Sequence, residues 1–269
     1  MQDDDICIAV AGGDGTVNEV LNGIEDFEKV RFAIIPVGSG NDFAGGLGIG
    51  KDIAQNLSGI IKALNKGNTC FRRIDLGKVS WQDKDGEKSR LFGISSGIGL
   101  DALVCKSVDH SVLKKILNFF HLGKLSYSLM TVFHLFSMET AEVEMEALEQ
   151  GKISFRKQLH KMIFLAAMNL RAEGGGVPMA PGASYVDGKL SFCSAAGVPK
   201  WQTFLYLPKL LKAKHEKLAG FCVEDAEKVR LKLSKPMVLH ADGEYLGDTE
   251  EAVFESLKGK LKLLNITQQ

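Results

Sequence analysis

Apolar residues follow two kinds of pattern in the first 66 residues of the chain. Residues 6–11 (ICIAVA) and 31–36 (RFAIIP) are short, nearly unbroken apolar runs, as expected for buried parallel strands. Over residues 17–24 and 52–65, apolar positions recur at helical spacing. Strands and helices therefore alternate, which predicts a parallel α/β layer over residues 6–66.

After Gly67 the chain changes to short strands separated by turn sequences such as Asp187-Gly188 and Asp242-Gly243. This spacing favours an antiparallel sandwich or barrel, interrupted by helical insertions at 102–136 and 200–218. We therefore predict one domain over residues 1–68 and a second over 69–269, whose last residues could return to the first. The predicted strands of the second domain are 73–81, 90–94, 140–147, 162–169, 190–196, 229–233, 237–241 and 261–264.

The composition excludes several classes of protein. The 269 residues include 33 Lys+Arg and 33 Asp+Glu, so the chain has no surplus positive charge with which to bind nucleic acid. Its five cysteines are far apart and form no C-x-x-C pair, which indicates neither a disulfide framework nor a zinc site. The acidic start, Met1 to Asp5, is unlike a signal peptide. We expect a soluble cytoplasmic protein.

Glycine is abundant, with 29 residues against 6 prolines, and it gathers in two loops that follow the first two predicted strands. Gly12, Gly13 and Gly15 precede the first helix, and Gly38 and Gly40 follow the second strand. Glycine lets backbone N–H groups approach an anion closely, and the N-terminus of a helix adds a positive end. Because both loops lie at the carboxyl edge of a parallel sheet, we predict that together they bind phosphate.

Polar residues in these loops have two interpretations. Asp14, Asn18, Asn41 and Asp42 could contact the ligand of the two loops. Alternatively, Asp14 is a turn residue, and Asn41 and Asp42 cap the helix that follows. The pattern of residues leaves both interpretations open.

Two segments carry a specific resemblance. AGGDGTVNEVLNGI (11–24) and IIPVGSGNDFA (34–44) resemble the catalytic domain of diacylglycerol kinases, a family that includes bacterial lipid kinases and sphingosine and ceramide kinases and is distantly related to NAD kinases. The resemblance continues through 74–77, 92–104 and 168–190 to Asp242-Gly243-Glu244. It implies an α/β plus all-β fold: an NAD-kinase-like nucleotide-binding domain, then an antiparallel β-sandwich domain that carries a lipid site. The implied activity is ATP- and Mg²⁺-dependent phosphorylation of a hydroxyl of diacylglycerol or a related lipid.

The resemblance also implies roles for single residues. Asp14 would be the route to Mg²⁺, Glu244 the general base, and Asp75 a second catalytic residue near the cleft. In isolation, Asp242-Gly243 would be interpreted as a turn, and His240 is expected to be a strand residue near the site. The implied ATP-binding residues are Gly12, Gly13, Asp14, Gly15, Thr16, Val17, Asn18, Ser39, Asn41 and Asp42.

A second, structural metal site is implied by the stretch from Ala180 to Gly188. By resemblance, Asp187 supplies a carboxylate, and the carbonyls of Ser184 and Lys189 complete the set of ligands. Mg²⁺ accepts oxygen ligands of this kind together with water. Without the resemblance, Asp187-Gly188 would be interpreted as a hairpin turn.

A lipid substrate would require contact with a membrane. The segment Trp201–Leu218 (WQTFLYLPKLLKAKHEKL) combines aromatic and aliphatic residues with lysines, and 113–136 is rich in Phe and Leu. Such segments suit an anionic interface, so we expect the protein to be peripheral to the inner face of the membrane. The alternative is that both helices pack on the sandwich. A homodimer is also compatible with the sequence.

Three departures from the family pattern affect the expected activity. The chain begins one strand before the first glycine loop, which implies a nucleotide-binding domain shortened at its N-terminus. Gly45 stands where the family often has Arg, and Ile94 replaces a common Asn. These departures keep open a catalytically impaired member that binds nucleotide or lipid. NAD kinase activity is a weaker alternative, which Asp75 and the 180–188 stretch disfavour.

Overall fold

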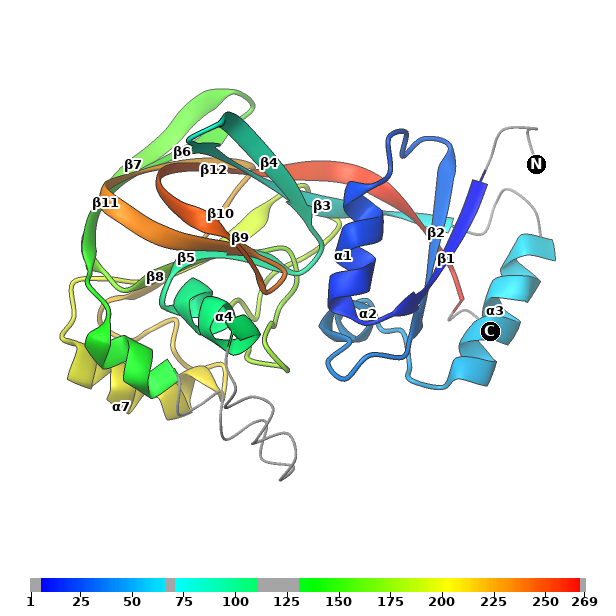
Figure 1. The fold of residues 1–269 in the computed structure, drawn as a ribbon, viewed down its shortest axis with the longest axis horizontal. Helices are drawn as coiled ribbons and strands as arrows, with labels where there is room; N and C mark the ends of the chain where they lie inside the picture. Colours follow the sequence, from blue (N-terminus) through cyan, green and yellow to red (C-terminus); the bar gives the residue numbers. More distant parts are fainter. Residues whose placement is uncertain (1–5, 66–70, 111–130, 267–269) are drawn as a thin grey trace.

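Two parts of the chain lie side by side: an α/β part, and a larger part built mostly of strands (Figure 1). The structure is a computed structural model, and it describes residues 6–65, 71–110 and 131–266. The predicted domain boundary at 67–70 and most of the predicted helix 113–136 lie outside the described residues.

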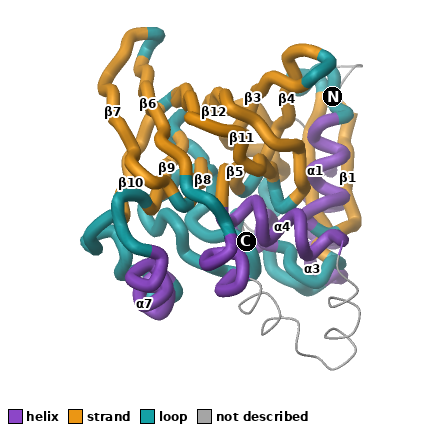
Figure 2. Tube along the Cα trace, turned by 60° about the vertical axis from the view of Figure 1, so that its left-hand side comes forward, coloured by secondary structure: helices purple, strands orange, loops and turns teal. Residues whose placement is uncertain are grey.

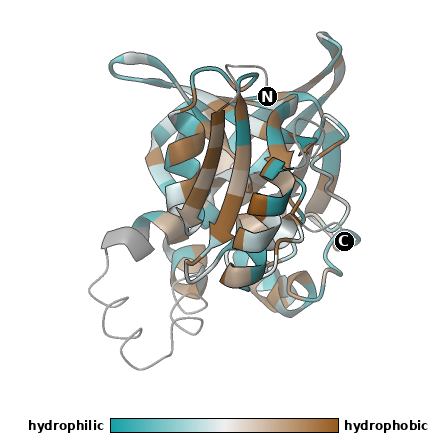
Figure 3. Cartoon of the chain, turned by 90° about the vertical axis from the view of Figure 1, so that its right-hand side faces the viewer, coloured by the Kyte–Doolittle hydropathy of each residue, from teal (hydrophilic) through white to brown (hydrophobic). Residues whose placement is uncertain are grey.

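The α/β part has two parallel strands with helices beside them. It consists of β1 (Ile6–Gly12), α1 (Asp14–Asn22), β2 (Val30–Pro36), α2 (Asp42–Gly46) and α3 (Ile53–Asn65). β1 and β2 pair in parallel, from Ile6 opposite Val30 to Gly12 opposite Pro36, so both strands end at the same edge. In Figure 3 the strands at the centre of the view are largely hydrophobic; β2 is buried along nearly its whole length, whereas β1 is partly exposed.

The larger part consists of antiparallel strand pairs together with helices, of which α4, α7 and a helical segment at 131–137 are described. Within one connected sheet, the strand order is β1-β2-β12-β11-β5-β8-β9-β10; β3 pairs with β12 and β4, and β6 with β11 and β7. The strands are β3 (Phe71–Asp83), β4 (Gly86–Phe92), β5 (Ser95–Gly99), β6 (Ala141–Glu149), β7 (Lys152–Met162), β8 (Phe164–Met168), β9 (Leu190–Ala195), β10 (Phe221–Ala226), β11 (Lys228–Ala241) and β12 (Glu244–Leu264); the helices are α4 (Leu100–His110) and α7 (Lys200–Leu210).

Two long strands, β3 and β12, connect the parts. They pair with each other from Trp81 opposite Ala252 to Phe71 opposite Leu264, and the end of β12 pairs in parallel with β2. Phe254 belongs to the hydrophobic core of the larger part, whereas Leu261 and Leu263 belong to that of the α/β part. The same strand is therefore buried in both cores.

The fold class predicted from the sequence, an α/β part followed by a β part, is confirmed. In detail, the predicted strands 229–233 and 237–241 form one strand, β11, with a register irregularity between Lys232 and Met237. β7 was not predicted because charged residues on its exposed face obscure its alternation, and β5 (SSGIG) because its residues are small. The division of the chain at residue 68 stays a prediction.

Helices α4 and α7 lie on the same side of the strands in Figure 2, and the space between them and the sheet holds the cavity described below. Within the described ranges, no helix is both long enough and apolar enough to cross a membrane.

Candidate functional site

The two glycine loops predicted to bind phosphate touch each other. Gly13 lies at the N-terminus of α1, and Gly38 is in the loop between β2 and α2. A Cβ atom on Gly38 would lie 2.4 Å from the Cα atom of Gly13, closer than any side chain can approach. Glycine at this position is therefore required for the loops to meet.

Asn41 closes the second loop with its side chain. The backbone N–H of Gly38 donates to Asn41 Oδ1 at 2.9 Å, and Asn41 Nδ2 donates to the carbonyl of Gly38 at 2.6 Å. Asn41 has a left-handed backbone conformation, with φ of 60°. Asn41 stands at the N-cap position of α2, but its side chain makes no cap hydrogen bond and closes the preceding loop instead, so capping by this side chain is not observed. Its role in binding ATP stays a prediction.

Asp14 links the first loop to the helix that follows the second. Its carboxylate accepts hydrogen bonds from the backbone N–H groups of Asp42 (3.1 Å) and Phe43 (3.0 Å). Asp42 in turn accepts one from the N–H of Gly175 at 2.7 Å. Burial raises the pKa of Asp42, as does the charge of Asp14, whereas the Gly175 hydrogen bond opposes the rise. Two mutually repelling carboxylates therefore lie together at this edge.

The pair Asp14 and Asp42 fits a magnesium ion that also binds phosphate. Mg²⁺ is usually held by one or two carboxylates together with phosphate oxygens and water. Burial, and after it the charge of Asp14, raise the pKa of Asp42, and a cation would oppose both effects. Other predicted ATP-binding residues lie around this pair: Ser39 and Thr16 are exposed, and Val17 is buried in the core.

Glu244 lies beside the first turn of α1. Its Oε2 atom accepts a hydrogen bond from Arg90 Nη2 at 2.6 Å, and a Cβ atom on Gly15 would lie 3.7 Å from its Oε1. Arg90 Nε also donates to Asn18 Oδ1 at 2.9 Å. The structure therefore brings the predicted general base next to the first glycine loop.

Asp242 is held by four hydrogen bonds at the turn between β11 and β12. It accepts from the N–H groups of Gly93 (2.8 Å), Ile94 (2.8 Å) and Ser95 (3.0 Å) and from Asn18 Nδ2 (2.8 Å). Burial raises the pKa of Asp242, and these hydrogen bonds oppose the rise. Because Asn18 is on α1, this carboxylate fastens the α/β part to the β part.

Asp75 is not brought to the glycine loops. It is buried on β3, and its two oxygens accept hydrogen bonds from the N–H groups of Gly259 (2.6 Å) and Gly188 (2.7 Å). Asp187 is exposed, and its carboxylate accepts a hydrogen bond from the N–H of Lys189 at 2.9 Å. In the described part of the chain, no three His, Cys, Asp or Glu side chains are grouped to hold a metal. The metal-binding role of Ser184, Asp187 and Lys189 stays a prediction.

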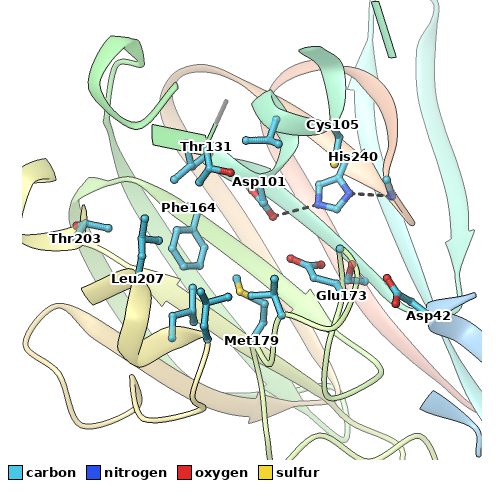
Figure 4. Close-up of a pocket in the computed structure, with 18 of the residues that line it drawn as sticks. Asp42, Asp101, Cys105, Thr131, Phe164, Glu173, Met179, Thr203, Leu207 and His240 are labelled. Atoms are coloured by element: carbon cyan, nitrogen blue, oxygen red, sulfur yellow. Dashed lines mark hydrogen bonds and ion pairs between the residues drawn. The ribbon is translucent and has the colours of Figure 1, made fainter. Parts of the chain in front are cut away.

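A cavity of about 580 Å³ begins at Asp14 and Asp42 and extends into the β part. Figure 4 shows its lining, with Asp42 on one side, Thr203 and Leu207 on the opposite side, and Asp101, His240 and Glu173 between them. The side away from Asp42 is apolar; its lining includes Val104, Phe164, Met179, Leu207, Leu210 and Phe221. The cavity is thus polar near the loops and apolar beyond.

Asp101, His240 and Glu173 form a titratable cluster in the middle of the cavity. His240 Nε2 lies 3.1 Å from Asp101 Oδ2, and the N–H of Gly243 donates to His240 Nδ1 at 3.3 Å. Burial lowers the pKa of His240, but the hydrogen bond and charge of Asp101 outweigh it and raise the pKa overall. Burial raises the pKa of Glu173 to about 7; Asp101 and Asp242 add to this, while His240 and Ser95 oppose it.

Sequence reasoning placed His240 near the site but gave no role to Asp101 or Glu173. All three come from different elements: α4, β11 and the segment between β8 and β9. The signal for Asp101 and Glu173 in the sequence is their position within two segments that carry the family resemblance, 92–104 (FGISSGIGLDALV) and 168–190. Nothing in the local pattern indicates that the two motifs meet.

Comparisons with known proteins agree with this arrangement. Residues 1–79 match the family model of the diacylglycerol kinase catalytic domain, and residues 94–265 match that of the YegS C-terminal NAD kinase beta sandwich-like domain. A diacylglycerol kinase of Bacillus subtilis (strain 168) is 31% identical over 242 residues, which cover 89% of this chain and 71% of the relative. YtlR of the same organism is 29% identical over 244 residues, which cover 90% of this chain and 75% of YtlR.

Solved structures show the same fold. A structure from Bacillus anthracis str. Sterne matches with a TM-score of 0.66 and 23% identity, over 96% of this chain and 77% of that one. The yeast NADH kinase complexed with NADH matches with a TM-score of 0.52 and 9% identity, over 96% of this chain and 60% of the yeast chain. The predicted likeness to the NAD kinase fold is therefore confirmed.

We predict that Gly38→Ala destabilises the protein by about 1–3 kcal/mol, because the new methyl group would overlap Gly13 and force the loops apart. Urea unfolding measures the change. Gly50→Ala is the matched control, because a Cβ atom there meets nothing within 4 Å. Equal effects of the two substitutions would contradict the close contact.

Glu173 should make stability depend on pH. The unfolded chain ionises this carboxyl near 4.5, whereas the folded chain keeps it neutral up to about 7. The folded state therefore holds the extra proton, and its free energy of unfolding falls as the pH rises between these values. Relative to Glu173→Gln, the wild type should lose on the order of 2 kcal/mol between pH 5 and pH 8.

Urea unfolding at the two pH values tests this expectation. Glu250→Gln removes an exposed carboxylate and should keep the wild-type pH dependence. If Glu173→Gln also keeps it, the Glu173 carboxyl ionises normally in the folded protein.

Proposed function

Because the chain belongs to the diacylglycerol kinase family, we propose that it is a lipid kinase that transfers the γ-phosphoryl group of ATP, with Mg²⁺, to a hydroxyl of diacylglycerol or a related lipid. One observation carries the proposal. A single cavity is lined at one end by the carboxylates of Asp14 and Asp42, which adjoin the glycine loops, and at the other by apolar side chains. Such a cavity suits a phosphate donor and a lipid that meet at its polar end.

In this proposal, backbone N–H groups of the two loops bind the ATP phosphates, together with Ser39 and Thr16 at the loop surface. Asp14 and Asp42 would hold Mg²⁺, which when bound neutralises charge on the phosphates. Asp14 already has a fixed orientation, because two backbone N–H groups hold its carboxylate. The loops therefore need little rearrangement to bind the nucleotide.

Glu244 is the proposed general base for the acceptor hydroxyl. It lies beside Gly15 at the start of α1, where the phosphates would bind, and Arg90 holds its carboxylate in place. Asp75 has a positioning role in this proposal, because it joins the turns at Gly188 and Gly259 instead of facing the cavity. The loop at Ser184, Asp187 and Lys189 would bind the structural metal.

We predict that Glu244→Gln lowers kcat for lipid phosphorylation by about 100-fold or more, because the amide cannot accept the proton of the acceptor hydroxyl. ATP binding, measured by equilibrium dialysis, should persist. The assay follows label from γ-labelled ATP into lipid, and Glu250→Gln serves as the control on an exposed carboxylate.

Two results of this assay would contradict the proposal. If the wild type labels no lipid in a panel of diacylglycerol and sphingoid acceptors, the chain is a non-catalytic member of the family. If it forms NADP⁺ from NAD⁺ and ATP instead, it is an NAD kinase.

A surface beside the apolar end of the cavity suits an anionic membrane. Trp201 and Leu205 on α7 are each 59% exposed, and Phe133 on the helical residues 131–137 is 66% exposed. The two helical segments touch, since the rings of Phe136 and Phe204 are 6.1 Å apart. Exposed lysines lie at the end of α7 and in the residues after it: Lys209, Lys212, Lys214 and Lys217. We propose that this surface binds the bilayer and lets lipid enter the cavity.

We predict that the double substitution Trp201→Ala, Leu205→Ala weakens binding to phosphatidylglycerol vesicles by about tenfold or more, because it removes exposed apolar area that would enter the interface. Vesicle sedimentation measures the loss. Ile153→Ala on β7 is the matched control, since this residue is also exposed but lies on another element. Equal binding by both variants would exclude α7 from the membrane contact.

A further inference from the structure

Arg90 places a positive charge next to the proposed general base. It lies on β4, and its Nη2 atom donates to Glu244 Oε2 at 2.6 Å. The side chain of Arg90 is 26% exposed and that of Glu244 is 36% exposed. Solvent therefore reaches this ion pair, and an anion bound beside it would compete with Glu244 for the guanidinium.

The other end of the guanidinium is held by a buried residue. Arg90 Nε donates to Asn18 Oδ1 at 2.9 Å, and Asn18 is fully buried. The Nδ2 atom of Asn18 donates to the carbonyl of Leu91 at 2.9 Å and to Asp242 at 2.8 Å. The N–H of Leu91 donates to Asn22 Oδ1 at 2.8 Å, so the backbone beside Arg90 is tied to α1 as well. Arg90 is therefore anchored at Nε, at the side of α1.

The guanidinium has donors to spare. It carries five N–H donors in a planar fork. Within the described residues, Arg90 makes one hydrogen bond from Nε and one from Nη2. The remaining N–H groups are available to a ligand, and a planar fork matches the oxygens of a phosphate group.

Glu244 connects Arg90 to the first glycine loop. Its Oε1 atom lies 3.7 Å from the position that a Cβ atom on Gly15 would take, in the first turn of α1. Its Oε2 atom accepts the hydrogen bond from Arg90. One carboxylate therefore separates the guanidinium from the turn at which the ATP phosphates are proposed to bind. A phosphate group at this turn would be a neighbour of both charges.

The ion pair has opposite consequences for a base and for a phosphate. A carboxylate that accepts a hydrogen bond from a guanidinium is a weaker proton acceptor, because the positive charge favours its ionised form. Glu244 has to accept the proton of the lipid hydroxyl, so its pairing with Arg90 opposes this step. The γ-phosphoryl group of ATP, in contrast, gains from a guanidinium, since negative charge is spread over its oxygens during transfer.

We propose that Arg90 contacts the γ-phosphoryl group of bound ATP, and that this contact draws the guanidinium away from Glu244. The proposal rests on the lipid kinase function proposed above and adds a residue to its site. In the transfer step, the lipid oxygen bonds to the γ-phosphorus, the bond from that phosphorus to the bridging oxygen of ADP breaks, and the hydroxyl proton passes to Glu244. Binding of ATP thus prepares the base as well as the phosphate.

Equilibrium dialysis with labelled ATP and labelled ADP, each with Mg²⁺ and without lipid, tests the contact. Arg90→Gln should weaken ATP binding by about tenfold or more, because it removes a charge-assisted hydrogen bond, and should leave ADP binding unchanged, because ADP has no γ-phosphoryl group. Arg90→Lys keeps the charge but not the planar fork, so its affinity for ATP should lie between those of the wild type and Arg90→Gln.

Arg156→Gln is the matched control for this measurement. It removes an exposed arginine of β7 that pairs with Glu146 at 2.8 Å, and it should change the binding of neither nucleotide. If Arg90→Gln weakens ATP and ADP binding equally, or weakens neither, the γ-phosphoryl contact is overturned.

The pH dependence of the reaction tests whether Arg90 leaves Glu244. The profile of kcat/KM for ATP reports the free enzyme, in which the two residues are paired, and the profile of kcat reports the ATP complex. Arg90→Gln should therefore move the acidic limb of the kcat/KM profile to higher pH by about one unit and leave that of kcat nearly in place. Equal shifts of both limbs would show that Arg90 stays on Glu244 and would overturn its transfer to the phosphate.

The binding measurement keeps this inference separate from the proposed function. If no lipid is phosphorylated but the wild type binds ATP more tightly than ADP and Arg90→Gln removes that preference, the kinase proposal fails and the Arg90 contact stands. If lipid is phosphorylated and Arg90→Gln behaves like Arg156→Gln, the kinase proposal stands and the contact fails. A wild type that binds neither nucleotide overturns both.

Discussion

The buried carboxylate of Asp242 is the contact on which the geometry of the site depends. It accepts three backbone hydrogen bonds from the corner between β4 and β5 and a fourth from Asn18 on α1. His240 lies two residues before it and faces the cavity, and Glu244 lies two residues after it and faces the start of α1. One turn therefore sets the positions of both groups relative to the glycine loops, and each buried donor left unpaired by removal of this carboxylate would cost about 1–3 kcal/mol.

The sheet gives this turn a rigid base. β12 is buried in the core of the β part near Phe254 and in the core of the α/β part near Leu263, and it pairs with β2 as well as β3 and β11. This pairing continues across both cores, with one register irregularity between Leu257 and Leu261, where the strand passes from one core to the other. The N–H of Gly175 adds a further link between the parts, because it donates to Asp42.

The strands, turns and helix starts that depend on neighbouring residues were predictable from the sequence. The contacts between residues far apart in the chain were not. Residues 6–46 were predictable because buried strands, glycine turns and helix starts are local patterns, and the loops are where the motif placed them. Asp75 could not be assigned from its own segment, because its partners Gly188 and Gly259 are more than a hundred residues away. The cluster of Asp101, Glu173 and His240 was missed for the same reason: three separate elements bring it together.

The distribution of charge bears on how the proposed kinase would bind ATP. The cavity lining within the described residues has no lysine or arginine, and Gly45 stands where related kinases often have Arg. In the proposed function, positive potential at the loops would come from backbone N–H groups, from Lys51, whose charge acts on Asp42, and from a metal ion held by Asp14 and Asp42, while Arg90 is already paired with Glu244. Without that metal, the phosphates would meet two carboxylates.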